Sequence, residues 1–377
     1  MKVTIDKGAL MVPLYRAQGV VDRKASTNVL ACVHMAAADG TLVFTATDYD
    51  VTITAEVSAE VTEPGSALVN GRTLFEVVRV LPDGVMVEIT ADENHRVRIE
   101  AGRAYYHLNG LAPEEFPEVV EEAQGKSLVL EKKQVEAMLR RTLFSVSTDE
   151  SRPALNGLLL EVEPAAEGSD KARVRMVSTD GHRLSKVERD AEARDYDGTS
   201  YRCIVHRNGA AQLQRIFEGG DQLVRIEFLG RNVVFTCDQA RLQVRQIEEA
   251  FPEYDRVIPA SSDVSITLRR TGLVEAIRRV SSLATGKHSL LRADLESGRL
   301  IFEMVHADFG DAHEEVELPD YDGGHVSIGF NPRYLLDVCG VLEAEMVNLQ
   351  VSDQFSPCLM RSDEEPGSLF VVMPMRL

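Results

Sequence analysis

The strongest constraint on the fold of this chain is an internal repeat with a period of about 130 residues. Three segments, beginning at Val3, Leu128 and Val264, combine a short β-rich stretch with a run of helical pattern. Each continues with a strand pattern that ends near an aspartate, which is Asp48, Asp180 or Asp308. A second helical run follows in each segment, beginning near Asn70, His206 or Asn331.

This period is longer than the repeat of any solenoid, so the sequence predicts three domains of one fold. The boundaries expected from the repeat are 1–124, 125–258 and 259–377. Each domain is predicted to be α+β, with one strand, a helix, four strands, a second helix and four more strands. The strands are expected to form antiparallel sheets on which the two helices pack.

The helical segments carry positive charge in a chain that is strongly acidic. The formal net charge is −19, yet the predicted helices (residues 7–17, 71–82, 131–142, 207–218, 269–280 and 331–342) are together net positive. Exposed helix faces often carry lysine and arginine, so charge alone leaves an ordinary solvated surface and a nucleic-acid surface both open. The threefold repetition favours the second, because equivalent helices on one side would merge into a single basic surface.

The composition indicates a cytoplasmic protein without disulfides. The five cysteines are odd in number and far apart, with no CxxC pair, which is typical of free thiols in a reducing compartment and gives no zinc site. The N-terminal residues are interrupted by Lys2, Asp6 and Lys7, unlike a signal peptide. No apolar run approaches the roughly 18 residues of a membrane helix.

Five motifs in the same order resemble the bacterial DNA polymerase III beta subunit, the sliding clamp, over the whole chain. They are ESRPALNG (150–157), TDGHRLS (179–185), FPEYDRVIP (251–259), IGFNPRYLLDV (328–338) and the terminal VVMPMRL (371–377). The resemblance implies a head-to-tail homodimer that closes into a ring of six domains around duplex DNA. It implies a processivity factor without catalytic activity or cofactor. An accessory or antibiotic-resistance paralogue with the same ring remains an alternative.

The resemblance also implies partners. They are double-stranded DNA, bound without regard to sequence, a second copy of the chain, and proteins that dock through short linear motifs, including the polymerase III alpha subunit, the clamp loader, other polymerases and repair proteins. No membrane partner is expected. The cations expected to face DNA are Arg23, Lys24, Arg72, Arg79, Lys132, Lys133, Arg140, Arg141, Arg207, Arg215, Arg269, Arg270, Arg278 and Arg279.

Matching the family residue by residue places one peptide-binding pocket between the second and third domains. Its expected residues are Leu155, Thr179, Gly181, His182, Arg183, Leu184, Pro252, Arg256, Val257, Asn331, Tyr334, Val371, Val372, Met373, Pro374, Met375, Arg376 and Leu377. The methionines suit varied ligands because their side chains repack easily. Two positions depart from the common family pattern, His288 in the pocket and Asn28 before a strand.

The stretch RAYYHLNGL (103–111) has the alternation of an edge strand and is expected to close the ring. Tyr106 and Leu108 match the family's interface on the first domain, and Leu283 on the third domain is the predicted partner.

Two other classes of function compete with the clamp. An enzyme could use Asp48, Asp180, His182 or His306, but the histidines have no HxH or HExxH spacing and no phosphate loop is present. Asp180-Gly181 between alternating segments is instead a strong hairpin signal. A sequence-specific DNA-binding protein would need a recognition helix or zinc finger, and no such motif is visible.

Overall fold

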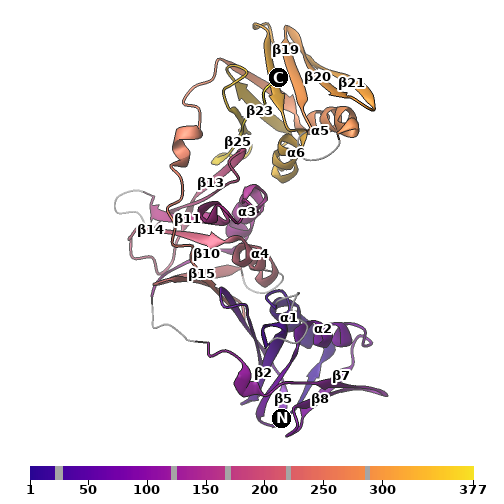
Figure 1. The fold of residues 1–377 in the computed structure, drawn as a ribbon. Coiled ribbons are helices and arrows are strands. Elements are labelled where there is room, and N and C mark those ends of the chain that lie inside the picture. The colour runs from indigo at the N-terminus through magenta and orange to yellow at the C-terminus, as the bar shows by residue number, and fades with distance from the viewer. Residues whose placement is uncertain (22–28, 120–124, 166–170, 218–221, 285–288) are drawn as a thin grey trace. The chain divides into compact units, whose positions relative to one another are not determined.

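The computed structural model of the chain describes residues 1–21, 29–119, 125–165, 171–217, 222–284 and 289–377. Three repeats follow one another along the chain, each with two helices (Figure 1). Each begins with a strand that runs directly into its first helix, and four strands follow as predicted, except that the first repeat has a fifth, β5 (Glu60–Glu63). The strand pairings whose register the described residues define are antiparallel, among them those of the first strand in each repeat, so the α+β prediction is confirmed. The predicted fourth strand after each second helix is wrong, because three strands follow and the next strand already opens the following repeat.

The elements of the first repeat are β1 (Lys2–Asp6), α1 (Lys7–Ala17), β2 (Cys32–Ala38), β3 (Thr41–Thr47), β4 (Val51–Ser58), β5 (Glu60–Glu63), β6 (Gly65–Asn70), α2 (Gly71–Arg79), β7 (Met86–Ala91), β8 (Arg96–Ala101) and β9 (Ala104–Asn109). Those of the second are β10 (Lys126–Glu131), α3 (Lys132–Thr142), β11 (Gly157–Pro164), β12 (Lys171–Thr179), β13 (Arg183–Glu192), β14 (Tyr201–His206), α4 (Arg207–Ile216), β15 (Leu223–Leu229), β16 (Asn232–Cys237) and β17 (Ala240–Arg245).

The third repeat contains β18 (Val264–Arg269), α5 (Arg270–Val280), β19 (Leu291–Glu296), β20 (Gly298–His306), β21 (Gly310–Leu318), β22 (Val326–Phe330), α6 (Pro332–Val341), β23 (Met346–Val351), β24 (Cys358–Arg361) and β25 (Ser368–Val372). Short 3₁₀ turns named below are η3 (Leu143–Ser145), η4 (Pro153–Leu155), η5 (Tyr254–Val257) and η6 (Ser281–Leu283). None of the described helices is long and apolar enough to cross a membrane.

Polar residues at the strand ends start several of the helices. The Asp6 carboxylate accepts a hydrogen bond from the Ala9 amide at 3.1 Å, and Asn70 accepts one from Thr73 at 2.9 Å. Asn331 caps α6 in the same way and is followed by Pro332 at the first helical position. Such caps satisfy amide groups that have no partner inside the helix, so each strand passes into its helix without a loop.

Backbone contacts divide the chain into two compact units, which share the second repeat. The first unit contains the described residues within 1–136, 166–172 and 191–247, and the second those within 137–165, 173–190 and 248–377. The first repeat belongs wholly to the first unit and the third repeat wholly to the second.

The first unit contains two sheets. One has the strand order β5-β1-β7-β8-β9 and the other β10-β15-β16-β17-β4-β3-β2-β6. The second sheet is continuous across two repeats, because β17 pairs with β4 and places Leu242 opposite Ile53. Helix α1 lies against β3 and β4, and fully buried side chains such as Phe44 and Phe235 fill the core.

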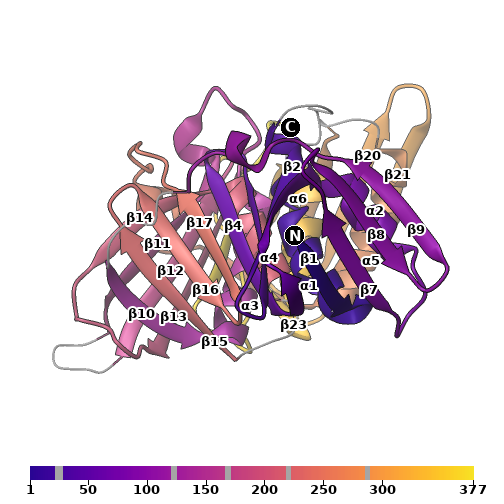
Figure 2. The same cartoon turned by 90° about the horizontal axis from the view of Figure 1, so that it is seen from below.

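Figure 2 shows β17 beside β4 in the first unit, and the second unit contains a corresponding pairing of strands from two repeats. Most of its strands belong to a sheet with the order β14-β11-β12-β13-β25-β24-β23-β18, and a separate sheet has the order β21-β20-β19-β22. The continuity between repeats here depends on β13 and β25, whose pairing places Ser185 opposite Phe370. Helix α5 lies against β20 and β21, and α6 contacts β25.

The two places where sheets join are therefore equivalent. We call β17 with β4 the first junction and β13 with β25 the second junction. Each joins the last strand of one repeat to the fourth strand of the preceding one. The strands left at sheet ends by this rule are β9 and β21.

Candidate functional site

The stretch Thr179–Arg183 forms a tight turn at the second junction. The Asp180 carboxylate accepts hydrogen bonds from the amides of His182 at 2.9 Å and Arg183 at 3.0 Å. Gly181 has φ +88°, a left-handed conformation that glycine adopts without a steric penalty. Thr179 donates its hydroxyl to the Arg183 carbonyl at 2.7 Å. The predicted hairpin turn is confirmed, and Asp180 is occupied in holding it.

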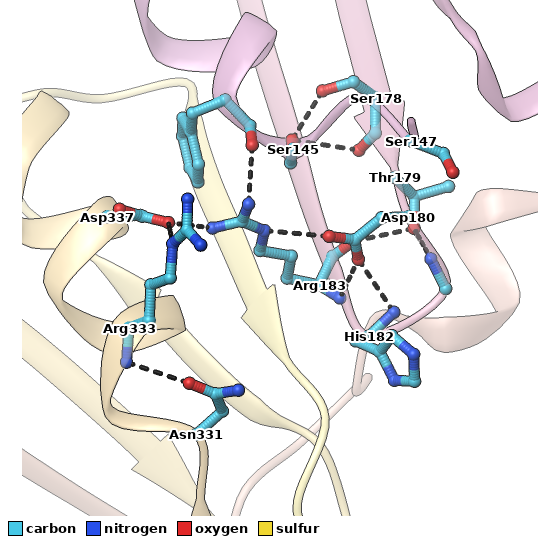
Figure 3. Close-up of polar contacts among 12 residues, drawn as sticks. Ser145, Ser147, Ser178, Thr179, Asp180, His182, Arg183, Asn331, Arg333 and Asp337 are labelled. Carbon is cyan, nitrogen blue, oxygen red and sulfur yellow. Dashed lines mark hydrogen bonds and ion pairs between the residues drawn. The ribbon is translucent and has the colours of Figure 1, made fainter. Parts of the chain in front are cut away.

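Arg183 is the centre of the site. Its side chain is buried, and its guanidinium donates to Asp180 at 3.1 Å and to Asp337 on α6 at 2.5 Å. A further N–H donates to the Phe144 carbonyl at 2.7 Å. Figure 3 shows Arg183 between the two carboxylates, one from β12–β13 and one from α6. Two charged partners and a carbonyl satisfy a cation that would otherwise be costly to bury.

Aromatic rings cover the Arg183 guanidinium on two sides. The ring centre of Phe144 is 5.0 Å from its central carbon and that of Tyr334 is 4.8 Å away, both within cation–π range. The His182 ring stacks on Tyr334 with 6.1 Å between centres. Burial and the charge of Asp180 raise the pKa of Tyr334 above its ordinary value, which keeps the phenol neutral. We call Phe144, Asp180, Arg183, Tyr334 and Asp337 the Arg183 cluster.

Buried hydroxyl groups lie behind the Arg183 cluster. The Ser145 hydroxyl is 2.6 Å from that of Ser178 and donates to Ser185 at 2.8 Å, while Ser178 donates to the Thr142 carbonyl at 2.5 Å. Figure 3 shows Ser145 and Ser178 close to the turn. A buried network whose members are all satisfied fixes the positions of η3 and of the ends of β12 and β13.

The C-terminal residues continue from β25 along the same surface. The Met373 amide donates to the His182 carbonyl and the Met375 amide donates to the Gly329 carbonyl, each at 2.8 Å. Val371 and Val372 are buried, whereas Met373, Pro374 and Met375 are half-buried and Arg376 and Leu377 are exposed. The tail thus reaches the surface next to His182 with its side chains partly open to solvent.

The η5 turn is attached to β13 from the other side. Lys186 donates to Asp255 at 3.1 Å and lies 5.4 Å from the centre of the Tyr254 ring. The predicted residues Pro252, Arg256 and Val257 are exposed on this turn, and Arg256 pairs with Glu253. Leu155 and Leu184 are buried, so they can supply only the floor of a binding site.

Sequence reasoning missed Phe144 and Asp337. Asp337 lies inside the IGFNPRYLLDV motif, six residues after Asn331, so a helical wheel would have placed it near Tyr334. Phe144 had no comparable signal, because its contact with Arg183 depends on how the end of α3 packs on β13.

The cations predicted to face DNA differ in their exposure. Arg72, Lys133 and Arg278 are exposed, and no carboxylate pairs with them in the described part of the chain. Four others have carboxylate partners: Arg79 with Glu76, Arg140 with Glu343, Arg269 with Glu345 and Arg279 with Glu314. Three are half-buried: Arg215, Arg270 and Arg207. Arg215 lies over the Tyr15 ring, and Arg270 donates to the carbonyls of Cys339 in α6 and Ala344 after it.

Lys132 and Arg141 cannot face DNA, and the prediction is wrong for these two. Only 7% and 6% of their surfaces are exposed. The Arg141 guanidinium is paired with the buried Glu365 at 2.5 Å, so the position on α3 turns inward. Arg23, Lys24, Asn28 and His288 lie outside the described residues.

The residues predicted for ring closure lie at sheet ends. Tyr106 and Leu108 are half-buried on β9, the terminal strand of its sheet, as the alternation predicted. Leu283 in η6 packs against the core beside β20 and β21, and β21 is the terminal strand of its own sheet.

The geometry gives no support to an enzyme. Asp48 and Asp180 both accept hydrogen bonds from the backbone of their own turns. Burial raises the pKa of Asp48, although the amides of Val51 and Asp50 oppose the shift. Asp308 is not equivalent to them, since its own amide donates to His306 Nδ1. The residue with a left-handed backbone in this turn is Gly310. Among the described residues, no group of three potential ligands could hold a metal ion.

Comparisons with known proteins agree over the whole length. Models of the DNA polymerase III beta subunit match in three parts, the N-terminal domain at 1–120, the central domain at 129–253 and the C-terminal domain at 255–376. The beta sliding clamp of Caulobacter vibrioides is 34% identical, with all of both chains covered.

Two solved structures are similar over all of both chains. The DNA polymerase III subunit beta from Pseudomonas aeruginosa has 32% identity and a TM-score of 0.90. A sliding clamp from Bartonella birtlesii, bound to griselimycin, has 29% identity and a TM-score of 0.93. The chain belongs to the DNA polymerase III beta subunit family.

Proposed function

We propose that the chain is a DNA sliding clamp whose copies join head to tail into a closed ring. The observation that carries the proposal is the pattern of sheet junctions. Two junctions form inside the chain, and β9 and β21 are the strands left without the partner that this pattern supplies. An interface between unlike surfaces of identical chains generates a ring when the rotation closes.

The two internal junctions also predict the register in which β9 would pair with β21 of the next copy. Tyr106 occupies on β9 the place of Leu242 on β17, and Ala312 occupies on β21 the place of Ile53 on β4. Since Leu242 lies opposite Ile53, Tyr106 would lie opposite the partner's Ala312. By the same count Leu108 would lie opposite the partner's Gly310, next to η6 and Leu283. Two copies with three domains each, divided near 1–124, 125–258 and 259–377, make the six-domain ring of the family.

Exposed cations on the helices would attract the DNA backbone. Arg72 on α2, Lys133 on α3 and Arg278 on α5 are the best placed of the predicted set, because each is exposed and unpaired among the described residues. Attraction of this kind is sequence-independent and is screened within about 10 Å at 0.1 M salt. It allows sliding, while closure of the ring prevents escape. The role is that of a cytoplasmic processivity factor and involves no catalysis.

Protein partners would dock at the Arg183 cluster and the C-terminal tail. His182, Arg376 and Leu377 are exposed around a buried floor of Leu184 and Val372. Half-buried Met373 and Met375 can repack around different side chains. The partners expected are short linear motifs of the polymerase III alpha subunit, the clamp loader, other polymerases and repair proteins.

Topological binding to DNA tests the ring directly. The protein is loaded by its clamp loader onto nicked circular DNA, which is then linearised. Retention on circles and loss from linear ends supports the ring, whereas equal retention on both contradicts it. Leu108→Asp places a charge in the proposed interface and should give a monomer in sedimentation that is not retained. Val80→Asp, at an exposed position after α2, is the matched control and should remain in the ring.

Deleting 373–377 tests the docking site. The truncated chain should lose binding of polymerase and clamp-loader peptides, measured by fluorescence anisotropy, and keep the oligomeric state of the full chain. Normal peptide binding by the truncated chain would show that the docking site lies elsewhere.

A further inference from the structure

The first strand of each repeat has a different neighbour on its outer side. In the first repeat β5 pairs with β1 and places Glu60 opposite Thr4. In the second repeat Arg194 bridges to Val129, with both possible backbone hydrogen bonds formed, at 2.8 and 3.2 Å. In the third repeat β18 is the last strand of its sheet, and no bridge reaches it from the described residues. Among the first strands of the three repeats, β18 is therefore the one whose outer edge no described residue covers.

Thr267 is the central residue of β18 whose backbone groups face this open edge. It precedes the first residue of its helix by three positions, as Thr4 and Val129 do. The Arg270 amide donates to the Glu345 carbonyl, which continues the ladder between β18 and β23. Because hydrogen-bonding direction alternates along an antiparallel strand, Leu268 and Ile266 bond toward β23 and Thr267 points away.

Pro319 explains why the edge stays open. It lies nine residues after Gly310, the same distance by which Glu60 follows Val51. Proline has no N–H and cannot donate to a neighbouring strand. The chain turns back instead: the Tyr321 amide donates to the Leu318 carbonyl at 3.0 Å and the Gly298 amide donates to the Tyr321 carbonyl at 2.7 Å.

A hollow of about 400 Å³ lies along the open edge, and we call it the β18 groove. Its walls are residues 265–269 of β18 and 316–321, and Gly272 and Leu273 of α5 also line it. Ile266, Leu268 and Leu318 are buried apolar residues in these walls. A volume of this order falls in the range of ordinary ligand sites.

We propose that the β18 groove binds an extended peptide segment of a partner protein by strand addition to β18. Main-chain bonds to Thr267 would supply affinity, and alternate apolar side chains would enter the groove. The charge of the groove wall also indicates the charge of the peptide. Glu317 and Asp320 are exposed in the wall, whereas the one cation there, Arg269, already pairs with Glu345 at 3.4 Å. The segment therefore carries lysine or arginine at the end next to these two carboxylates.

This inference does not depend on the ring, because the groove lies wholly within the second unit. It is tested with an array of capped hexapeptides that alternate Val, Ile, Leu or Phe with Thr and carry Lys or Arg at one end. Binding to the full chain is measured by fluorescence anisotropy. Some members should bind, and each binder should bind Thr267→Pro at least tenfold more weakly.

Thr267→Pro removes the N–H that faces the groove, together with the threonine hydroxyl, and proline is tolerated on an edge strand in this position. Thr267→Val is the matched control, since it keeps the N–H and loses only the hydroxyl that bonds to Asn348. It should bind the same peptides as the wild type. Gly272→Leu is a second blocking variant. A Cβ there meets no heavy atom within 4 Å, so the side chain enters the groove while leucine favours the helix over glycine.

Hydrogen exchange gives an independent measurement. The Thr267 amide should exchange rapidly in the free protein and at least tenfold more slowly with a bound peptide, and the Val129 amide should be protected in both. The proposal is overturned if no peptide in the array binds the wild type better than Thr267→Pro, or if bound peptides leave exchange at Thr267 unchanged. Assembly of the chain through β18 in place of peptide binding would overturn it as well.

Discussion

The two internal junctions share a turn and differ in what surrounds it. At the first junction the Asp48 carboxylate accepts hydrogen bonds from Asp50 at 3.1 Å and Val51 at 2.7 Å. At the second, Asp180 makes the corresponding bonds to His182 and Arg183. The aspartate turn is therefore a structural requirement of both junctions and does not by itself mark a binding site.

The side chains around the two turns are different in kind. The other four members of the Arg183 cluster have smaller or uncharged equivalents at the first junction. These are Gly19 for Phe144, Val51 for Arg183, Gly209 for Tyr334 and Gln212 for Asp337. A side chain at Gly209 would meet the branched side chain of Val244, and one at Gly19 would require the side chains of Gln212 and Arg215 to move. A Cβ on Gly209 would lie 2.4 Å from Val244 Cγ1, and one on Gly19 would lie 2.3 Å from Gln212 Oε1.

The first junction consequently retains a different surface. A hollow of about 420 Å³ there is lined by Asp48, Val51, Gln212 and neighbouring residues, and the described part of its lining contains no arginine or aromatic ring. A repeated fold can thus carry a docking site at one junction only, and the residues that depart from the repeat identify which one.

The largest loss of stability is expected when Arg183 at the second junction is replaced by valine, the residue that Val51 provides at the first junction. Arg183→Val leaves Asp180 without its cation and leaves Asp337 with Arg333 alone, at 3.7 Å. Breaking a buried charged pair costs about 3–5 kcal/mol. We expect a loss of this size in the free energy of unfolding measured in urea, together with loss of peptide binding. Arg183→Lys keeps the charge but loses the forked geometry of the guanidinium. Its free energy of unfolding should lie between those of the wild type and Arg183→Val. A loss below about 1 kcal/mol would show that the cluster does not stabilise the junction.

A second comparison uses the equivalent arginines Arg141 and Arg16. Arg141 pairs with Glu365, which is 9% exposed, and Arg16 pairs at 3.5 Å with the more exposed Asp238. Glu365→Gln should therefore cost about 3 kcal/mol by leaving a buried cation. Arg16 is buried as well, but Asp238 is 35% exposed at 3.5 Å and Arg16 also donates to the Ile216 carbonyl, so Asp238→Asn should cost less, about 1 kcal/mol. Equal losses in urea unfolding would contradict this difference between the junctions.

The lowered pKa of Glu365 determines how its contribution to the free energy of unfolding changes with pH. Burial raises the pKa of Glu365, but the amides of Glu343 and Ala344 and the charge of Arg141 outweigh it, so the pKa is below its ordinary value. A carboxyl group with a lowered folded pKa stabilises above its unfolded pKa of about 4.3, and the contribution is lost as pH falls through the folded value. Glu365→Gln should flatten the fall in stability below about pH 4.3, whereas Asp238→Asn serves as the comparison.

The sequence was sufficient for elements and turns because these depend on local periodicity. The segment 331–342 was predicted as a helix and α6 spans Pro332–Val341, and the Asp180-Gly181 turn followed from short-range backbone preferences. The Arg183 cluster was only partly predictable. Asp337 is 154 residues from Arg183, and their contact depends on the pairing of β13 with β25.

The exposure of individual helix cations could not be obtained from the sequence. Arg140 and Arg141 are adjacent in α3, yet one is exposed and the other is 6% exposed. Successive residues of a helix point in directions about 100° apart. Which of them turns inward depends on Glu365, 224 residues further along the chain.

Alanine substitutions at two helical glycines, Gly209 in α4 and Gly272 in α5, test how tightly the first junction is packed. Gly209→Ala gains about 1 kcal/mol of helix propensity, but its Cβ would contact Val244, and overpacking costs about 1–3 kcal/mol. We expect a net loss in the free energy of unfolding. Gly272→Ala is the matched control at the third residue of α5, where the space is open, and should stabilise the protein. Stabilisation by both substitutions would show that the first junction has room for side chains.

The smallest effect concerns the left-handed residue that both turns require. The first turn uses Tyr49 with φ +75° and the second uses Gly181 with φ +88°. A residue with a Cβ in this conformation costs about 1–2 kcal/mol, so Gly181→Ala should lower the free energy of unfolding by about 1 kcal/mol. Tyr49→Gly should raise it by less, because glycine also gains freedom in the unfolded chain. Thermal unfolding under identical conditions compares the two. If both substitutions destabilised the protein equally, Tyr49 would be making contacts that offset its backbone strain, and the turns would not be interchangeable.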